Sequence, residues 1–196
     1  MSIRVTALTG ASLATGLDDL AHLRITVFRD FPYLYDGTLD YERGYVEKFA
    51  RAEGAVIVAA FDGDDIVGVA TASPLLGHAD AFAAPLRAAG YDPARIFYFG
   101  ESVLLPQYRG LGLGHRFFDV REAHARQAGG YAQTAFCAVI RPADHPRRPA
   151  DYRPLDAFWT KRGYTRSTGT IATFDWRDID QSESTAKHMQ FWMRPL

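Results

Sequence analysis

A glycine turn at residues 109–114 constrains this chain more than any other feature. An apolar strand ends at Pro106, three alternate glycines follow, and apolar residues then recur at helical spacing. The glycines are Gly110, Gly112 and Gly114. Glycine lets the backbone approach a ligand closely and adopt positive φ, and the first N–H groups of a helix have no partner within the helix. Because the helix dipole adds partial positive charge there, the turn predicts an anion site suited to a pyrophosphate.

The spacing of the glycines excludes two common phosphate-binding loops. A Walker A loop carries Lys-Ser/Thr directly after its glycines, and this turn does not. A dinucleotide fingerprint is G-x-G-x-x-G in an early βαβ unit with an acidic residue about 20 positions later, whereas this turn is G-x-G-x-G in mid-chain. A strand–helix turn without a ligand is the alternative. The strand before the turn, Arg109 at its start and the helix after it favour the ligand site.

Strand and helix signals alternate along the rest of the chain. Period-two patterns and apolar runs predict strands over residues 2–8, 55–61, 66–72, 95–105, 131–140, 168–176 and 187–194. Apolar spacing of three and four, with its start and stop signals, predicts helices over residues 17–30, 40–52, 111–128 and 154–162, and an irregular helical connection over 77–94. This order predicts a single domain over residues 1–196, with one central sheet and helices on its faces.

Composition limits the classes of partner and location. The net charge is −1, so the totals point neither to nucleic acid nor to an anionic membrane. No apolar run approaches the roughly 20 residues of a membrane span, and residues 1–10 show no signal peptide, so we expect a cytoplasmic protein. The single cysteine, Cys137, lies in an apolar run and is expected in the core, with a catalytic thiol as the alternative. No Cys/His spacing predicts a metal site.

Two segments of the chain resemble the GNAT superfamily of acyltransferases. Arg109-x-x-Gly112-x-Gly114 matches the family's R/Q-x-x-G-x-G/A signature, after a similar strand-Pro-x-Tyr-Arg-Gly approach at residues 103–110. Downstream, Phe158-Trp159-x-Lys161-x-Gly163-Tyr164 is similar to the family's F-Y-x-K-x-G-F segment. The interval between them is longer than usual because of a Pro- and Arg-rich segment at residues 141–153, called the basic loop below. The resemblance implies an α/β (α+β) fold: a central, mixed, mostly antiparallel, twisted sheet with helices on both faces.

The resemblance also implies acetyl-CoA as the acyl donor. Backbone N–H groups of the glycine turn would hold the pyrophosphate, and the main chain of residues 103–105 would pair with the pantetheine amides like an added strand. A separation between the strands at 95–105 and 131–140 would admit the cofactor arm. The residues expected at the donor are Val103, Leu104, Leu105, Arg109, Gly110, Leu111, Gly112, Leu113, Gly114, His115 and Trp159.

Acyl transfer to an amine needs a route for the amine's proton and a hydrogen-bond donor for the oxyanion. Glu101 is the first candidate base, because it precedes the segment that would present the thioester and many family members carry a glutamate there. His145 and Tyr152, on the basic loop, are further candidates. A main-chain amide near Val103 or Leu104 is the candidate oxyanion donor. His115 is expected beside phosphate or as a helix cap rather than in the chemistry.

Trp159 departs from the family pattern. The family often places a tyrosine at this position, four residues before the glycine of its second motif, where it protonates the departing thiolate. Tryptophan cannot donate a proton usefully, so three interpretations stay open. The thiolate leaves unaided, another hydroxyl such as Tyr152 or Tyr164 substitutes, or the domain binds CoA without turnover.

The acceptor is expected near the first two helices and the late strands. Residues 31–37 form an aromatic turn that is either an acceptor wall or packing, and the region holds Arg29, Phe31, Tyr33, Tyr35 and Tyr41. The arginines of the basic loop either meet an anionic acceptor or the 3′-phosphate of CoA, or belong to a solvated loop; they are Arg141, Arg147, Arg148 and Arg153.

The resemblance therefore predicts an N-acetyltransferase that acts on the primary amine of a small molecule by direct attack. A non-catalytic acyl-CoA-binding module and a protein lysine or N-terminal acetyltransferase are the alternatives. A homodimer is left open.

Overall fold

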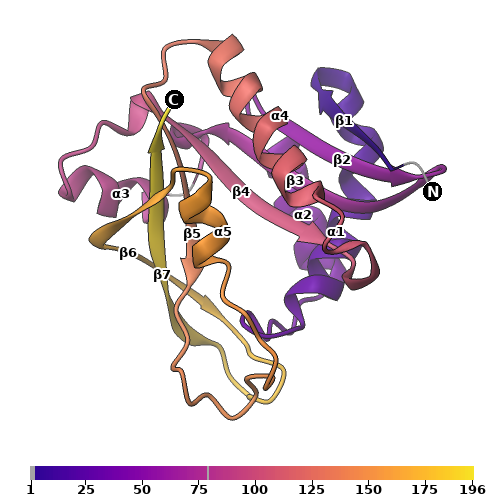
Figure 1. Ribbon diagram of the computed structural model, residues 1–196, viewed down its shortest axis with the longest axis vertical. Coiled ribbons are helices and arrows are strands. Elements are labelled where there is room, and N and C mark those ends of the chain that lie inside the picture. Colours follow the sequence, from indigo (N-terminus) through magenta and orange to yellow (C-terminus); the bar gives the residue numbers. More distant parts are fainter. Residues whose placement is uncertain (1–2, 79) are drawn as a thin grey trace.

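A seven-stranded sheet forms the centre of the computed structural model, which describes residues 3–78 and 80–196 (Figure 1). The strand order is β1-β2-β3-β4-β5-β7-β6. Neighbouring strands are antiparallel except β4 and β5, which are parallel. The predicted mixed, mostly antiparallel sheet is therefore confirmed. The strands are β1 (Arg4–Thr9), β2 (Val56–Asp62), β3 (Asp65–Pro74), β4 (Ile96–Leu104), β5 (Gln133–Val139), β6 (Thr165–Trp176) and β7 (Thr185–Pro195).

Helices cover both faces of this sheet, as predicted. In Figure 1, α4 crosses in front of the sheet, and α1 and α2 lie behind it. Among the described residues, every helix is too short or too polar for a bilayer crossing. The helices are α1 (Leu17–Phe28), α2 (Leu39–Ala50), α3 (Asp80–Ala88), α4 (Leu113–Ala128) and α5 (Asp156–Lys161).

The burial of β2 shows how the sheet separates two cores. Val56, Val58 and Ala60 pack in the core beneath α4, and Ile57 and Ala59 pack in the core beneath α1 and α2. All five are fully buried. Because alternate residues of a strand point to opposite faces, a strand covered on both sides needs an unbroken apolar run. This explains why residues 55–61 carry no polar side chain.

Element boundaries differ from the sequence prediction by a few residues. β6 begins at Thr165 rather than at 168. Thr165 and Arg166 already pair with β7, and the pairing continues from Ile171 after an irregular segment. α4 begins at Leu113 rather than at 111, because Gly112 is a left-handed N-cap. The connection at 77–94 holds α3 and the short 3₁₀ helix η3 (Pro93–Arg95). Residue 2, the predicted start of the first strand, lies outside the described residues.

β4 and β5 separate after a short parallel ladder, as the sequence predicts. They pair only at Ile96↔Gln133, Phe97↔Thr134 and Tyr98↔Ala135. Beyond these positions β5 continues beside β7, while β4 continues beside β3. Figure 1 shows the two strands diverging toward opposite sides of the molecule. The C-terminal half of β4 therefore has no strand on its β5 side, and Ser102 is exposed in the middle of the sheet.

Candidate functional site

The glycine turn lies directly beyond the open half of β4. Gly110 and Gly112 have φ of 82° and 77°, conformations that L-residues with side chains rarely adopt. In the part of the chain that the structure describes, the N–H groups from Gly110 to Gly114 donate to no main-chain acceptor, and no side chain caps α4. A row of free N–H groups at the positive end of a 16-residue helix is an anion site.

The second sequence motif packs against this turn. A Cβ placed on Gly114 would lie 3.4 Å from Cζ of Phe158, so glycine allows α5 to approach the first turn of α4. His115 stacks edge-on against Phe158 with a centroid separation of 4.8 Å, and it accepts from Arg162 at 3.2 Å. The two segments that resemble one family, about 50 residues apart in sequence, thus meet at one helix end. The donor residues predicted there stay a prediction, since no ligand is present.

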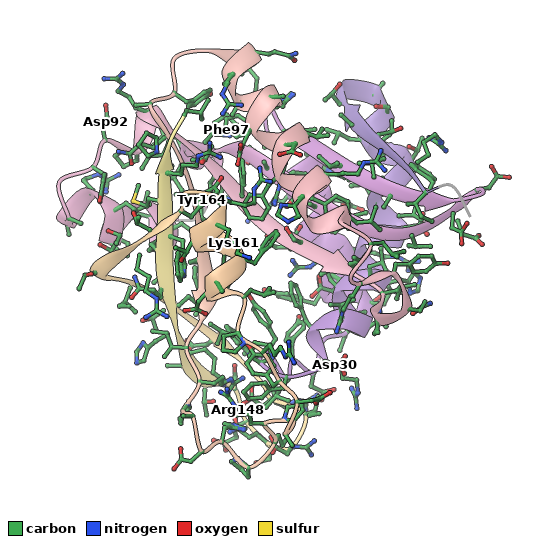
Figure 2. The ribbon with its side chains drawn as sticks, in the orientation of Figure 1. Asp30, Asp92, Phe97, Arg148, Lys161 and Tyr164 are labelled. Carbon is green, nitrogen blue, oxygen red and sulfur yellow. The ribbon has the colours of Figure 1, made fainter. Side chains whose placement is uncertain are left out.

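Trp159 and Tyr164 differ in burial and in the contacts of their side chains. Trp159 is half-buried, with ring centroids 5.0 Å from Phe136 and 5.1 Å from Trp192. Tyr164 is fully buried between α4 and the sheet (Figure 2), and its hydroxyl lies 2.9 Å from Oγ1 of Thr134. Tyr164 also donates to Glu122 at 3.2 Å. The interpretation of Tyr164 as a substitute acid is therefore wrong, because its hydroxyl is committed to the core.

Glu101 lies at an irregularity in β4, where the register with β3 shifts opposite Thr71. A Cβ on Gly100 would overlap Oγ1 of Thr71, so glycine is needed beside this bulge. The Glu101 carboxylate is 4% exposed and accepts three hydrogen bonds. Its donors are Arg24 at 2.5 Å, Thr71 at 2.9 Å and Tyr45 at 3.4 Å. The sequence prediction placed Glu101 correctly beside the open half of β4, and its role as a base stays a prediction.

Arg24 joins Glu101 to a second buried carboxylate, Glu42 of α2, which is fully buried. Burial opposes the charge of Arg24, but Glu101, Tyr45 and Glu42 outweigh it and raise the Arg24 pKa above its usual value. Arg24 also lies over the ring of Tyr45 at 4.2 Å. This cluster of Arg24, Glu42, Tyr45 and Glu101 lies where the first two helices pack on β4, in the region where the sequence predicts the acceptor, and we call this region the acceptor side.

On the opposite face of the sheet, Arg121 of α4 is 1% exposed and supports the same bulge. Its Nη1 donates to the main-chain oxygens of Thr71 at 3.2 Å and Glu101 at 3.4 Å. Burial lowers the pKa of Arg121 to about 10. Sequence reasoning missed both buried arginines. Arg24 lies four residues after Leu20 and Arg121 four after Phe117, so each occupies an inward helical position, which was the available signal.

The basic loop covers the aromatic turn. Tyr152 packs edge-on against Phe31 at 4.7 Å, and the His145 ring lies 5.6 Å from the same ring. Arg148 lies over Tyr152 at 4.9 Å. Figure 2 shows Arg148 and Asp30, the residue before the aromatic turn, at the lower end of the molecule. Burial raises the pKa of Tyr152. The loop therefore brings Tyr152 and His145 to the acceptor side, although neither contacts Glu101 through a hydrogen bond among the described residues.

Arg141 holds this arrangement together. Its guanidinium donates to the main-chain oxygens of Pro32 at 2.7 Å and Tyr33 at 2.6 Å, and to both carboxylate oxygens of Asp178. The aromatic turn also pairs by main chain with residues 177–179, through a bridge between Tyr35 and Asp178. We call these contacts the clasp. Arg141 is therefore not a free cation, and its interpretation as a ligand for an anion is wrong. Arg147 pairs with Asp180 at 2.8 Å at the surface, and its role toward an anion stays a prediction.

The remaining acceptor-side candidates diverge. Tyr33 packs inward on the core cluster of β4, β5 and β7. Tyr35 lies beside Glu42, and burial together with Glu42 raises the pKa of the Tyr35 phenol. Arg29 pairs with Asp36 at the surface. Tyr41 is 63% exposed.

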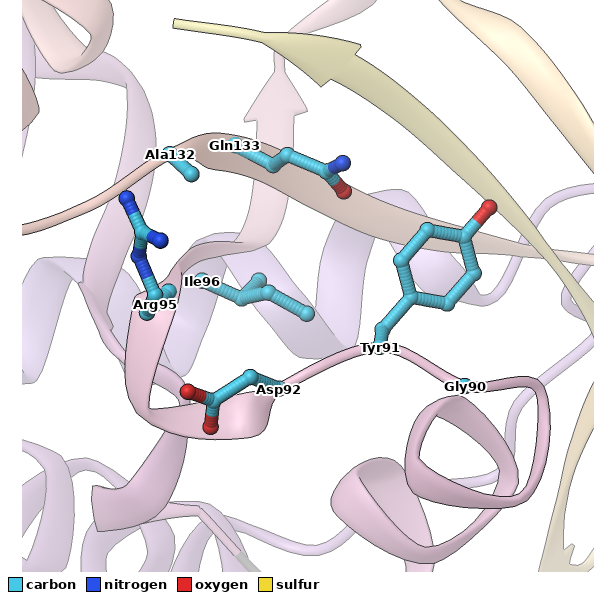
Figure 3. Close-up of a pocket in the computed structure, with 7 residues that line it drawn as sticks. All are labelled: Gly90, Tyr91, Asp92, Arg95, Ile96, Ala132 and Gln133. Carbon is cyan, nitrogen blue, oxygen red and sulfur yellow. The ribbon is translucent and has the colours of Figure 1, made fainter.

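Two further predictions concern Cys137 and the surface. Cys137 is buried, as expected, with its sulfur 2.9 Å from the Tyr98 hydroxyl, and burial raises the thiol pKa to about 12. A pocket of about 210 Å³ lies at the other end of the parallel ladder (Figure 3). It is lined by residues such as Asp92, Arg95 and Gln133, and it includes none of the predicted site residues.

Comparison with known proteins agrees with this geometry. A family model described as the acetyltransferase (GNAT) family matches residues 20–149. No curated protein matches the sequence.

Several solved structures share the fold. An acetyltransferase of the GNAT family from Streptococcus pneumoniae is 11% identical, with a TM-score of 0.58 and coverage of 100% of each chain. A ribosomal-protein-alanine N-acetyltransferase from Brucella melitensis is 14% identical, with a TM-score of 0.59 and coverage of 100% of each chain. The protein yncA from Salmonella typhimurium, solved with its cofactor acetyl-CoA, is 10% identical, with a TM-score of 0.61 and coverage of 100% of this chain and 95% of that chain. At these identities the likeness concerns the fold alone.

Proposed function

Because this chain belongs to the GNAT family of acetyltransferases, we propose that it transfers an acetyl group from acetyl-CoA to the primary amine of a small molecule. The observation that carries the proposal is the row of free N–H groups of the glycine turn, which lies at the end of the unpaired half of β4. The turn suits a pyrophosphate and the unpaired strand edge suits the amides of pantetheine. One ligand carries both groups in that order, and it is an acyl-CoA.

The residues proposed for the donor follow from this placement. N–H groups of residues 110–114 hold the pyrophosphate, and main-chain groups of residues 103–105 pair with the pantetheine arm. Arg109 is exposed at the start of the turn and adds a positive charge. His115 and Trp159 flank the same helix end from α4 and α5. A main-chain N–H of the β4 edge near Val103 stabilises the oxyanion as it forms.

The clasp supports a small acceptor over a polypeptide. A peptide that presents a lysine or an N-terminus needs an open groove across the acceptor side. Here the aromatic turn and the segment after β6 are joined by main-chain hydrogen bonds, with Asp36 donating to Arg177 at 2.9 Å and Ile179 donating to Leu34 at 2.7 Å. Arg141 ties the basic loop to both segments. The path between them is closed, and so a compact amine is the acceptor that we propose.

Glu101 is the proposed acceptor of the amine's proton. The two oxygens of a carboxylate offer about four sites for hydrogen bonds, and three are used by Arg24, Thr71 and Tyr45. The fourth is the site that we propose for the incoming amine. The nitrogen bonds to the thioester carbon, the carbon–sulfur bond breaks, and the proton lost by the amine ends on the thiol. The net reaction is acetyl-CoA plus amine to acetamide plus CoA.

A direct assay tests the proposal. The purified chain is mixed with acetyl-CoA and a panel of small primary amines, and the released CoA thiol is measured. Amine-dependent thiol release is expected, with the N-acetyl product found by mass spectrometry. If no amine on the panel releases thiol, the proposed function is contradicted.

A non-catalytic CoA-binding module is the second candidate, and Trp159 is the observation that favours it. That alternative predicts tight binding of CoA in a titration with no turnover of any amine. A peptide panel in the same assay tests the protein acetyltransferase alternative. Faster acetylation of peptides than of small amines would contradict the closed acceptor side.

A further inference from the structure

Resting on the proposed function, we propose that Tyr33 is a catalytic residue: its hydroxyl donates a hydrogen bond to the sulfur of the departing thiolate. In this chain the family's tyrosine is replaced by Trp159, so the leaving group lacks its usual donor. Tyr33 comes from a different part of the fold, the aromatic turn between α1 and α2. The argument depends on where its ring lies, how its main chain is held, and which other hydroxyls are already engaged.

The Tyr33 ring lies over the point where β4 and β5 part. It packs on a core cluster that includes Tyr98 of β4 and Cys137 of β5. Tyr98 belongs to the last pair of the parallel ladder, opposite Ala135, and Cys137 is two residues further along β5. The separation of these strands is where the thioester of an inserted acyl-CoA arm would emerge on the acceptor side. Tyr33 is therefore placed at the reacting end of the arm rather than along it.

The surroundings of Tyr33 fix its position from two directions. Its main-chain oxygen accepts from Arg141 at 2.6 Å and from Nε1 of Trp176 at 3.1 Å. Its ring lies 4.4 Å from the ring of Phe28 and stacks on Trp176 at 6.1 Å. A side chain held by aromatic rings on two sides and by a clasped backbone loses little entropy when it binds a ligand.

The next residue shows backbone strain. Leu34 has φ of 55°, and it is the one described residue other than glycine with a left-handed backbone. Its N–H donates to Asp30 at 3.0 Å, and its oxygen accepts from Ile179 at 2.7 Å. Strained backbone persists only where surrounding contacts fix it, and such positions cluster at active sites. The strain lies in the residue directly after Tyr33, within the turn that carries the ring.

Two other phenol hydroxyls of this region are engaged. The Tyr98 hydroxyl lies 2.9 Å from the sulfur of Cys137, and Tyr45 donates to Glu101. Within residues 3–78 and 80–196, no side chain or main-chain group forms a hydrogen bond with the hydroxyl of Tyr33 or Tyr152. Tyr152 lies on the outer basic loop against Phe31. Tyr33 is thus a free phenol hydroxyl on the side chain that packs on Tyr98 and Cys137, the residues at the end of the parallel ladder.

The electrostatics of Tyr33 suit a hydrogen-bond donor. Burial raises the pKa of the Tyr33 phenol above its usual value, Cys137 raises it further, and Arg24 lowers it. Glu101 and Tyr152 add smaller upward effects. The phenol therefore keeps its proton at neutral pH and donates rather than accepts. As the carbon–sulfur bond breaks, the sulfur takes the bonding electron pair with the Tyr33 O–H directed at it, and the amine's proton, released through Glu101, converts the thiolate to thiol.

Tyr33→Phe tests the proposal, with Tyr91→Phe as the matched control. Tyr91 is a half-buried tyrosine packed on the same core cluster, but it lines the pocket at the far end of the ladder (Figure 3). We expect Tyr33→Phe to lower kcat about 100-fold, with the KM for acetyl-CoA and the melting temperature close to wild type. Tyr91→Phe should leave kcat within about twofold. A kcat of Tyr33→Phe equal to wild type overturns the proposal.

A second variant separates a chemical role from a packing role. Replacement of Tyr33 by a fluorinated tyrosine keeps the shape and the hydroxyl but lowers the phenol pKa. We expect normal kcat at low pH and a loss of kcat as pH rises through the lowered pKa, which wild type does not show. An unchanged pH profile contradicts the donor role. Loss of kcat in Tyr152→Phe with none in Tyr33→Phe assigns the role to Tyr152 instead.

The outcomes also separate this inference from the proposed function. A wild-type chain that binds acetyl-CoA but releases no thiol with any amine contradicts both. An active wild type with an equally active Tyr33→Phe contradicts the role of Tyr33 alone.

Discussion

The donor side and the acceptor side of this protein are built differently. The predicted donor side is one contiguous turn. Among the described residues, its N–H groups at 110–114 donate to no main-chain acceptor, which suits an anion. The acceptor side is closed, and it is assembled from α1, α2, the aromatic turn, the basic loop and the segment after β6. A site that is formed by the backbone of one short segment can be predicted from a sequence motif. A closed site made by buried charges depends on contacts between segments that lie 18 to 109 residues apart in sequence.

This difference suits two-substrate chemistry. All acetyl-CoA molecules share the same pyrophosphate, so a generic backbone site is enough for the donor. The identity of the product depends on the acceptor. We therefore expect the acceptor site to be lined by specific side chains, such as Tyr33, Phe31 and Tyr152. The comparison predicts that changes on the acceptor side alter stability and acceptor use, whereas changes at exposed positions of the glycine turn alter CoA affinity alone.

The largest effect is expected when the clasp is broken. Asp178 is 1% exposed and neutralises Arg141 and Lys187. Asp178→Asn leaves two buried cations unpaired, and we expect a loss of about 3–5 kcal/mol in the free energy of unfolding. Urea denaturation measures it. Asp180→Asn, which breaks the exposed pair with Arg147, should cost less than about 1 kcal/mol. Equal losses would show that the clasp does not hold the acceptor side.

The next effect concerns pH. Burial lowers the pKa of His78 from 6.5 to about 4, and its Nε2 lies 2.7 Å from Oγ of Ser73. Between these values the unfolded chain binds a proton that the folded protein does not. The contribution of neutral His78 to the free energy of unfolding is therefore complete above pH 6.5. It is lost as pH falls toward 4, by up to about 3 kcal/mol. Unfolding free energies of wild type and His78→Phe, measured from pH 7 to 4, should converge or cross as pH falls. Parallel curves would contradict the burial of a neutral His78.

On the donor side, Gly112→Glu places bulk and negative charge at the proposed pyrophosphate site. We expect acetyl-CoA affinity to fall at least about 100-fold, or about 2.7 kcal/mol, with the fold retained. Titration calorimetry measures the affinity. Gly112→Asn is the control, because asparagine tolerates the left-handed backbone of this position and adds no charge, and it should cost only a few-fold. Unchanged affinity in Gly112→Glu would refute the glycine turn as the donor site.

The smallest effect is expected from Leu111→Ala. Leu111 is 61% exposed in the glycine turn, whereas Leu113, two residues later, is 2% exposed. Leu111→Ala should change the free energy of unfolding by no more than about 0.5 kcal/mol, and Leu113→Ala should cost about 2–5 kcal/mol. A large loss in Leu111→Ala would mean that the turn is packed rather than open.

The donor side and most elements were predictable from the sequence for the same physical reason. Helix periodicity, glycine positions and apolar runs are local signals, so the glycine turn, α4 and the order of elements along the chain followed from short windows. Glu101 could be named as a candidate because it precedes residues 103–105 in sequence and because the family resemblance places a glutamate there. The splay of β4 and β5 followed from the family resemblance.

The acceptor side was not predictable in the same way. Arg141 looked like a free cation of a basic loop, but its partner Asp178 lies 37 residues away, and only the folded chain brings them together. Glu42 and Arg24 are adjacent because α1 and α2 pack on one another, and no short motif encodes that contact. The inward helical positions of Arg24 and Arg121 were the one local sign that charges are buried beneath β4.

A crystal structure of the wild-type chain with acetyl-CoA tests the central claim most directly. We predict pyrophosphate oxygens within hydrogen-bond distance of the N–H groups of residues 110–114, and the thioester between β4 and β5 beside Glu101 and Tyr33. Acetyl-CoA bound elsewhere, for example in the pocket beside Asp92 and Gln133, or with its thioester outside the strand separation, would contradict the account.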